Sequence, residues 1–225
     1  MKLQLLRPTL VFAGAWNPAV FQPGWLAKNV HGIPVGAEVR VDEVTVVEEG
    51  HAQKKINYMQ ALGILVSQTR LEIYPTAIDD QYLKTTEEKV AKILELLPHT
   101  PLSAFGVNFF FEDRSPSSAL RCKVRSGDGL SDILSIVAEQ LTSYAEIEEH
   151  VQLNLQRRSQ QSAVSFNFNY HQEAGEIEVI RSEIVGVIQR RLDQSIDILK
   201  RCYGLSEYDV VRPELPPEMD SPDHA

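Results

Sequence analysis

The sequence predicts an α+β protein built as two topologically similar halves, each a mainly antiparallel sheet covered by amphipathic helices. Segments with apolar residues at helical spacing are interspersed with segments whose apolar residues recur at every second position. The order strand, helix, three strands, helix occurs twice, and the closing helices lie about a hundred residues apart, the size of a small domain. Of the 225 residues 43% are hydrophobic, which is enough for one good core or two small ones.

The first half contains four segments with strand character and two with helix character. Thr85 and Glu88 form a capping box, and Pro98 ends the helix that follows. A change of phase between Val41 and Val44 predicts a bulge near Glu43. The predicted elements are strand Thr9–Gly14, helix Pro23–Val30, strand Glu38–Val47, the hairpin strands Asn57–Ser67 and Arg70–Tyr74, and helix Thr85–Leu97.

The second half repeats this order with one additional strand. Gly204 is the expected end of the last helix. The predicted elements are strands Ala104–Glu112 and Ala119–Arg125, helix Gly129–Tyr144, the hairpin strands His150–Arg157 and Val164–His171, strand Glu176–Arg181, and helix Ser182–Tyr203.

These patterns divide the chain into a first half over residues 1–100, a second over 101–205 and a disordered, proline-rich and acidic tail over 206–225. A true duplication would place a groove between the halves, and grooves at such seams often bind ligands. Residue identity between the halves is weak, so chance recurrence of common elements stays open as the alternative.

The composition narrows the compartment and the partners. Twenty-two basic against 31 acidic residues give a formal charge of −9, which opposes binding to duplex nucleic acid or an anionic membrane. Two cysteines, Cys122 and Cys202, are too few for a disulfide scaffold. The apolar start resembles a signal peptide, but Gln4, Arg7 and Pro8 interrupt it. No apolar stretch reaches the length needed to cross a bilayer, so we expect a cytoplasmic protein.

The most informative segment is the hairpin of His150–Arg157 and Val164–His171, which has an apolar face and an amide face. Asn and Gln are poor choices for a freely solvated strand face, so this face is expected to contact something polar. With a four-residue loop, Asn154 would face Asn167 and His150 would face His171. The alternative is a polar face whose amides satisfy one another. Its outward residues are His150, Gln152, Asn154, Gln156, Asn167, Asn169 and His171.

No metal or other cofactor is expected. His150 and His171 supply only half of a tetrahedral site, and no third ligand is evident in the sequence.

A basic segment leading into a glycine-rich helix start is a candidate phosphate site. Arg121, Lys123 and Arg125 would share one strand face and lead to Gly127 and Gly129, where exposed helix N–H groups attract anions. A charged edge strand that protects itself from aggregation would explain the same residues.

Two tryptophans flank a turn in the first half. Trp16 and Trp25 could stack on a partner or anchor an interface. The alternative is that they pin a short helix onto the sheet.

No catalytic motif is present: the nucleophile elbow, the phosphate loop, the dinucleotide fingerprint and the common zinc signatures are all missing. We therefore expect a binding or assembly protein rather than an enzyme, one that binds itself as a homo-oligomer or another protein. Its contact surface would be the amide-rich sheet face or the groove between the halves. The alternative function is recognition or turnover of a small phosphorylated ligand or nucleotide at the basic segment. A hydrolase whose residues assemble from distant positions is the third possibility.

Overall fold

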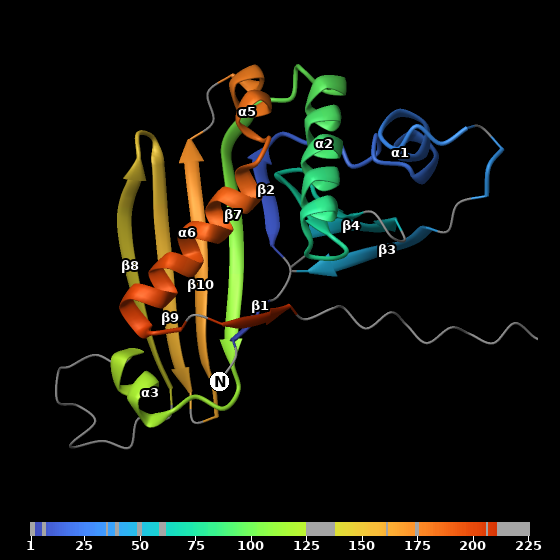
Figure 1. Cartoon of the computed structure of the whole chain (residues 1–225). Coiled ribbons are helices and arrows are strands. Elements are labelled where there is room, and N and C mark those ends of the chain that lie inside the picture. The colour runs from blue at the N-terminus through green and yellow to red at the C-terminus, as the bar shows by residue number, and fades with distance from the viewer. Residues whose placement is uncertain are drawn as a thin grey trace, which may run out of the picture.

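The computed structural model describes residues 3–5, 8–34, 36–38, 41–48, 51–58, 62–124, 138–160, 162–173, 176–205 and 207–210. These residues form a mixed α+β structure in which a mostly antiparallel sheet carries its helices on one side (Figure 1). The predicted tail lies almost entirely outside the described residues.

Nine strands form the main path of the sheet, in the order β3-β4-β5-β6-β2-β7-β10-β9-β8. Every neighbouring pair on this path is antiparallel. Two short strands extend it at one end, where β1 pairs with β7 and, in parallel, with β11. The strands are β1 (Leu3–Leu5), β2 (Thr9–Gly14), β3 (Val41–Glu48), β4 (His51–Tyr58), β5 (Leu62–Val66), β6 (Arg70–Pro75), β7 (Leu102–Asp113), β8 (Ala138–Glu148), β9 (Val151–Gln160), β10 (Val164–Glu173) and β11 (Tyr208–Val210).

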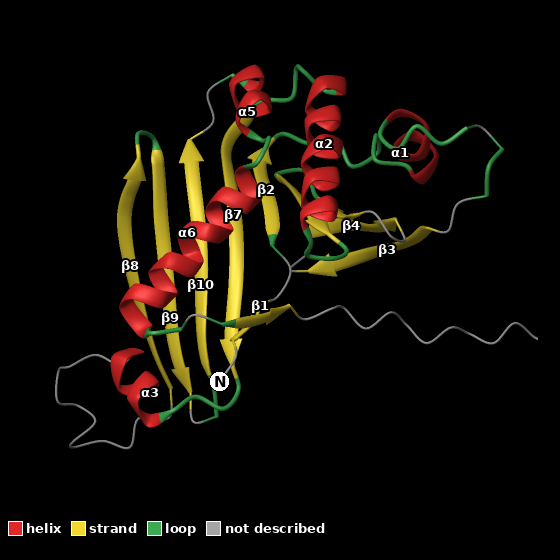
Figure 2. Ribbon diagram, in the orientation of Figure 1, coloured by secondary structure: helices red, strands yellow, loops and turns green. Residues whose placement is uncertain are grey.

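The helices pack against the apolar side of this sheet (Figure 2). Helix α2 packs on β6, α6 crosses β7, and α3 lies at one end of β9 and β10. A π-helical turn extends α6 and ends at Gly204, whose φ of 72° closes the helix in the left-handed conformation that glycine tolerates. The helices are α1 (Pro23–Asn29), α2 (Asp80–Leu96), α3 (Ser118–Val124), α5 (Ile177–Glu183), α6 (Val187–Ile198) and the turn η1 (Leu199–Tyr203).

One continuous core lies between the helices and the sheet. Alternate residues of the central strands enter it, and Phe12, Phe109, Phe111, Phe166 and Phe168 are completely buried there. Because strand residues alternate between faces, the residues between these phenylalanines lie on the side that the helices leave uncovered.

A buried carboxylate fixes the helix layer. Glu87 of α2 is 4% exposed, and its two oxygens accept the backbone N–H groups of Gly186, at 2.7 Å, and Ile188, at 2.8 Å. The N–H groups at the start of a helix have no acceptor within the helix itself. Glu87 therefore caps α6, which begins about a hundred residues later in the chain. Burial raises the pKa of Glu87, and the two backbone hydrogen bonds oppose that shift.

Several predicted elements are confirmed. Strand Thr9–Gly14 has the predicted bounds, and Arg70–Pro75 forms a hairpin with β5. The predicted partner strand Asn57–Ser67 is not continuous, because Asn57 and Tyr58 belong to β4, which pairs with β5. The helices near Pro23, before Pro98 and before Gly204 are present. The helix before Pro98 begins earlier than predicted, because Asp79 rather than Thr85 caps it by accepting from the N–H of Tyr82.

Four other predictions are wrong. Segment Ala119–Arg125 is helical as far as Val124, since Leu120 and Val124 are buried one helical turn apart. Glu176–Arg181 belongs mostly to helix α5, where Ile177, Ile180 and Ile184 share a buried stripe. The last part of predicted helix Gly129–Tyr144 is strand β8, because β9 offers its edge for pairing; residues 125–137 lie outside the described residues. Strand β3 pairs with β4 without a bulge.

The duplication of the two halves remains a prediction. In the sheet, β2 pairs with β6 and β7 pairs with β10, while β2 and β7 lie side by side. The first half contributes the meander β3 to β6 and the second contributes β8 to β10.

Candidate functional site

The uncovered face of the sheet carries the amides that the sequence singles out. On β9 and β10 the core side is apolar, while Gln152, Asn154, Gln156, Asn167 and Asn169 lie on the other side. The predicted face assignment of this hairpin is therefore confirmed. We call this surface the open face.

Three asparagines form a row across the middle of the open face. Asn169 of β10 lies opposite Asn108 of β7 on one side and Asn154 of β9 on the other. Thr9 of β2 and Tyr144 of β8 continue the row at its two ends. With strands spaced about 4.8 Å apart, these five residues span about 19 Å. Tyr144 is 77% exposed at the end of the row.

Two of these asparagines have unused hydrogen-bonding capacity. The side-chain oxygens of Asn108 and Asn154 are buried, and among the described residues neither has a donor within hydrogen-bonding distance. Buried acceptors of this kind cost free energy unless water or a ligand donates to them. The row therefore contains two acceptor groups for which the described residues supply no donor.

Shallow hollows lie on either side of the asparagine row. One, of about 170 Å³, lies where β2 meets β7 and is lined by small residues, including Ala13, Ala104 and Gly106, with Arg70 and His171 beside them. The other, of about 200 Å³, includes Phe110, Gln156 and Asn167. The first hollow lies at the boundary between the two predicted halves.

Acidic and basic side chains at the borders of the open face neutralise one another. Arg70 bonds Glu72 at 2.7 Å, and Arg114 bonds Glu112 at 2.7 Å. Amides therefore set the character of its centre.

The predicted register of the amide hairpin is wrong by two residues. The loop spans two residues instead of four, because the Gln160 N–H donates to the Ala163 carbonyl at 2.8 Å. Asn154 consequently faces Asn169, and Gln156 faces Asn167. The even shift leaves the side of each residue unchanged.

The two histidines do not meet. His171 lies opposite Gln152, whereas His150 occupies the turn between β8 and β9 with a φ of 69°. In the described part of the chain, no three His, Cys, Asp or Glu side chains come together as a metal site requires.

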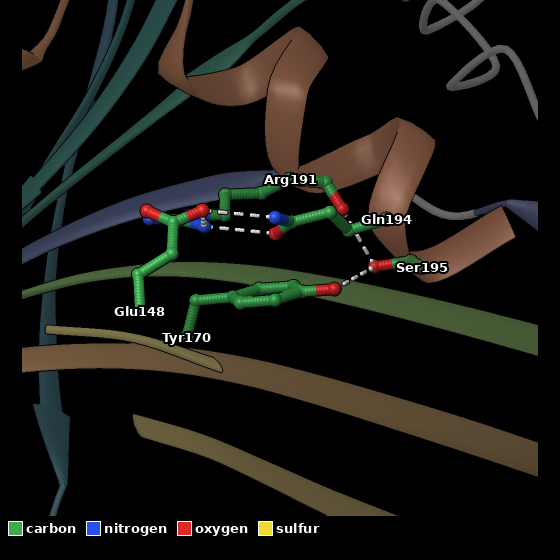
Figure 3. Close-up of polar contacts among 5 residues, drawn as sticks. All are labelled: Glu148, Tyr170, Arg191, Gln194 and Ser195. Atoms are coloured by element: carbon green, nitrogen blue, oxygen red, sulfur yellow. Dashed lines mark hydrogen bonds and ion pairs between the residues drawn. The ribbon is translucent and has the colours of Figure 1, made fainter. Parts of the chain in front are cut away.

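The helix-covered side holds a cluster of five residues joined by polar contacts (Figure 3). Arg191 of α6 is 3% exposed and makes two bonds to the carboxylate of Glu148, at 2.7 and 2.9 Å. Its guanidinium lies 5.5 Å from the centre of the Tyr170 ring. The Tyr170 hydroxyl is 2.9 Å from Ser195 Oγ, and Gln194 also contacts Glu148.

The geometry of this cluster suits a clamp better than a catalytic site. Ser195 donates to the Arg191 carbonyl, so its proton is committed to the helix backbone. Burial raises the pKa of Tyr170 to about 12, which keeps the hydroxyl protonated. Hydrogen bonds from Arg191 hold the pKa of Glu148 at about 2, so it stays a carboxylate. Together these groups fasten α6 to β10 and to the end of β8.

The two tryptophans belong to the core side. Trp16 is 4% exposed, donates to the Phe12 carbonyl at 3.0 Å and contacts the Phe21 ring. Trp25 packs on the other side of Phe21 and is partly buried. Because Trp16 is buried, it is not available to a partner, and its assignment to the predicted contact surface is wrong. Its contacts fit the alternative prediction, in which the tryptophans pin a short helix onto the sheet.

The strand that was predicted to carry the candidate phosphate site is a helix in the structure. Arg121 and Lys123 lie on the short helix α3 instead of on one strand face. Arg125, Gly127 and Gly129 fall outside the described residues.

Sequence reasoning missed Asn108 and Tyr144. Asn108 is a single amide among the phenylalanines of β7, so its relation to the hairpin depends on the pairing of β7 with β10. Tyr144 was placed at the end of a helix. Recognising β7 as the neighbour of β10 would have found Asn108.

No helix in the described part of the chain combines the length and apolar character that a membrane span needs. Comparison with known proteins finds no matching family model and no curated protein of similar sequence.

Proposed function

We propose that this protein is a non-enzymatic binding or assembly protein whose contact surface is the open face. The observation that carries the proposal is the row of Asn108, Asn169 and Asn154, in which two buried side-chain oxygens lack a donor among the described residues. Amides that satisfied one another would leave no such acceptors, so the row favours contact with an external polar partner.

The partner that best fits this surface is another protein, including a second copy of the chain. A protein surface supplies neutral N–H and O–H donors at the spacing of side chains and backbone, whereas duplex nucleic acid supplies phosphate acceptors. The net charge of −9 also opposes a polyanion.

The hollow over Gly106 gives the open face a depression into which a partner side chain fits. Its floor of small residues lies at the seam of β2 and β7. If the two halves are a duplication, this seam is the predicted groove between them, and contact there would engage both halves.

The test replaces the three asparagines together with alanine and compares association with that of the unchanged protein. Immobilised protein is incubated with extract from its own source cells, and retained proteins are identified by mass spectrometry while light scattering reports self-association. The matched control carries alanine at Arg190, Asp193 and Asp197, three exposed positions of α6.

We expect the asparagine variant to lose at least one association that is made through the open face, with another protein or with a second copy, while the helix control retains it. The proposal is wrong if the asparagine variant, folded as shown by circular dichroism, retains every association of the unchanged protein.

A further inference from the structure

Strand β8 ends the sheet with an unusually open edge. It is eleven residues long and, among the described residues, pairs only with β9. Most of its residues are exposed, including those on the helix side such as Ser143 and Ala145. Figure 1 shows it at the margin of the sheet, where Arg191 of α6 contacts its last residue, Glu148.

Along β8, the backbone N–H and C=O groups of successive residues point alternately toward β9 and away from the sheet. The hydrogen bond from Gln160 to Ala163 shows that even-numbered residues of β9 bond to β10. Odd-numbered residues of β9 therefore direct their backbone N–H and C=O groups toward β8. Their partners Leu141, Ser143 and Ala145 bond inward. Gln140, Thr142 and Tyr144 therefore direct N–H and C=O groups away from the sheet.

The middle of the edge lacks the usual protection against strand pairing. Residues 140–145 contain no charge and no proline, although natural edges use lysine, inward charges, proline or bulges to prevent pairing. The glutamates of β8 and a bulge between Glu146 and Glu148 lie toward its ends. The opposite edge, β3, carries Asp42 and Glu43 within its length. An edge with six uncharged residues in a row, which pairs on one side alone among the described residues, is a typical site of strand addition.

We propose that β8 pairs antiparallel with β8 of a second copy of this chain, around a two-fold axis that passes beside Ser143. In that register Thr142 lies opposite the partner's Tyr144, so outward backbone groups of both copies meet. Residues opposite one another share a face in an antiparallel pair, so the open faces of both copies lie on the same side.

The positions of the acidic residues favour a second copy over other occupants. Glu139 lies on the helix side of β8 and Glu146 on the open face, as their partners Ser159 and Gln152 show. In the register centred on Ser143, Glu139 lies opposite Ile147 and Glu146 opposite Gln140, so no two glutamates face each other. Thr142 with Tyr144 is a favourable cross-strand pair.

Pairing would join two open faces into one continuous surface, with a Tyr144 from each copy near the axis. This inference rests on the proposed function for its use, since the joined surface would present two asparagine rows to one partner. The edge contact itself involves no asparagine of the row, so the two proposals fail separately.

The first experiment compares the same change on the two sheet edges. Thr142→Lys puts a charge on β8, and the matched control Thr45→Lys puts it on β3, where the residue is also exposed. Thr142→Pro is a second variant, which removes an outward N–H and leaves the bonds to β9 in place. Sedimentation equilibrium measures dimerisation, and circular dichroism checks that each variant is folded.

We expect the unchanged protein and Thr45→Lys to dimerise, and both Thr142 variants to dimerise at least tenfold more weakly. A monomeric unchanged protein, or dimers that survive both Thr142 variants, would overturn the proposal. The alanine variant of the three asparagines should still dimerise; if it alone dissociates, the open face and not the edge joins the copies.

A crosslinking experiment tests the register. Cysteine at position 143 is introduced after Cys122 and Cys202, which are both exposed, have been replaced by serine. Opposed residues that do not bond one another lie about 4.5 Å apart between Cα atoms, within the range for a disulfide. We expect rapid disulfide-linked dimers with Ser143→Cys and none with Thr45→Cys; equal crosslinking of both would contradict the register.

The salt dependence of association distinguishes a second copy of the chain from a basic peptide bound at the same edge. Two chains of charge −9 repel each other, so screening should tighten the dimer as salt rises. A dimer that weakens with salt would count against edge-to-edge pairing of identical chains.

Discussion

The two faces of β10 differ in burial and in chemistry. Phe166 and Phe168 are completely buried beneath the helices, while Asn167 and Asn169 remain partly exposed on the open face. One strand thus supplies the core and the candidate contact surface through the alternation of its side chains. Residues on the helix side should determine stability, and residues on the open face should determine association.

The largest expected change in the free energy of unfolding comes from comparing two neighbouring residues on opposite faces of β10. Phe168→Ala removes a completely buried ring and should lower the free energy of unfolding by about 3 to 5 kcal/mol. Asn169→Ala, one residue further, should change it by less than about 0.5 kcal/mol. Urea denaturation measures both. If Asn169→Ala costs as much as Phe168→Ala, the open face is part of the folding core and the division is wrong.

A smaller change in the free energy of unfolding is expected at the hydrogen bonds that join helices α2 and α6. Glu87→Ala leaves the N–H groups of Gly186 and Ile188 without their acceptor, and should lower the free energy of unfolding by about 1 to 3 kcal/mol. Its neighbour Glu88 is exposed, so Glu88→Ala should stay within about 0.5 kcal/mol of the unchanged protein. Equal effects of the two substitutions would show that the cap contributes nothing.

The sequence predicts the face assignment because alternation depends only on the chain itself. The apolar and amide sides of β9 and β10 follow from a period of two, and any even shift in register preserves them. The helices that end near Leu97 and Gly204 are likewise predicted, since periodicity and the helix-ending residues agree, although the cap predicted at Thr85 is misplaced.

The errors occur where tertiary pairing overrides local pattern. The segment before Tyr144 has a helical stripe, yet residues 138–148 form β8 because β9 is available as a neighbour. Segments Ala119–Arg125 and Glu176–Arg181 are short enough that alternation and helical spacing fit almost equally well. Asn108 joins the candidate site only through the pairing of β7 with β10, which a single sequence does not specify.

The smallest expected effect is a pH dependence at the polar clamp on the helix side. Hydrogen bonds from Arg191 hold the pKa of Glu148 at about 2, below its ordinary value of 4.5. Between these values the unfolded chain binds more protons than the folded one, so stability rises with pH. The contribution is complete above pH 4.5 and is lost as pH falls toward 2.

Urea midpoints measured across this window test the clamp. Because the Glu148 side chain is 43% exposed, solvent screens the pair and the change in midpoint should be modest. Glu148→Gln should flatten that part of the profile, whereas the alanine variant of the three asparagines should leave it unchanged because the open face contributes no group to the clamp. A profile that Glu148→Gln does not alter would mean that Arg191 holds α6 without help from the carboxylate. Apolar packing, the Glu87 cap and the Tyr170–Ser195 hydrogen bond would then hold the helix side together.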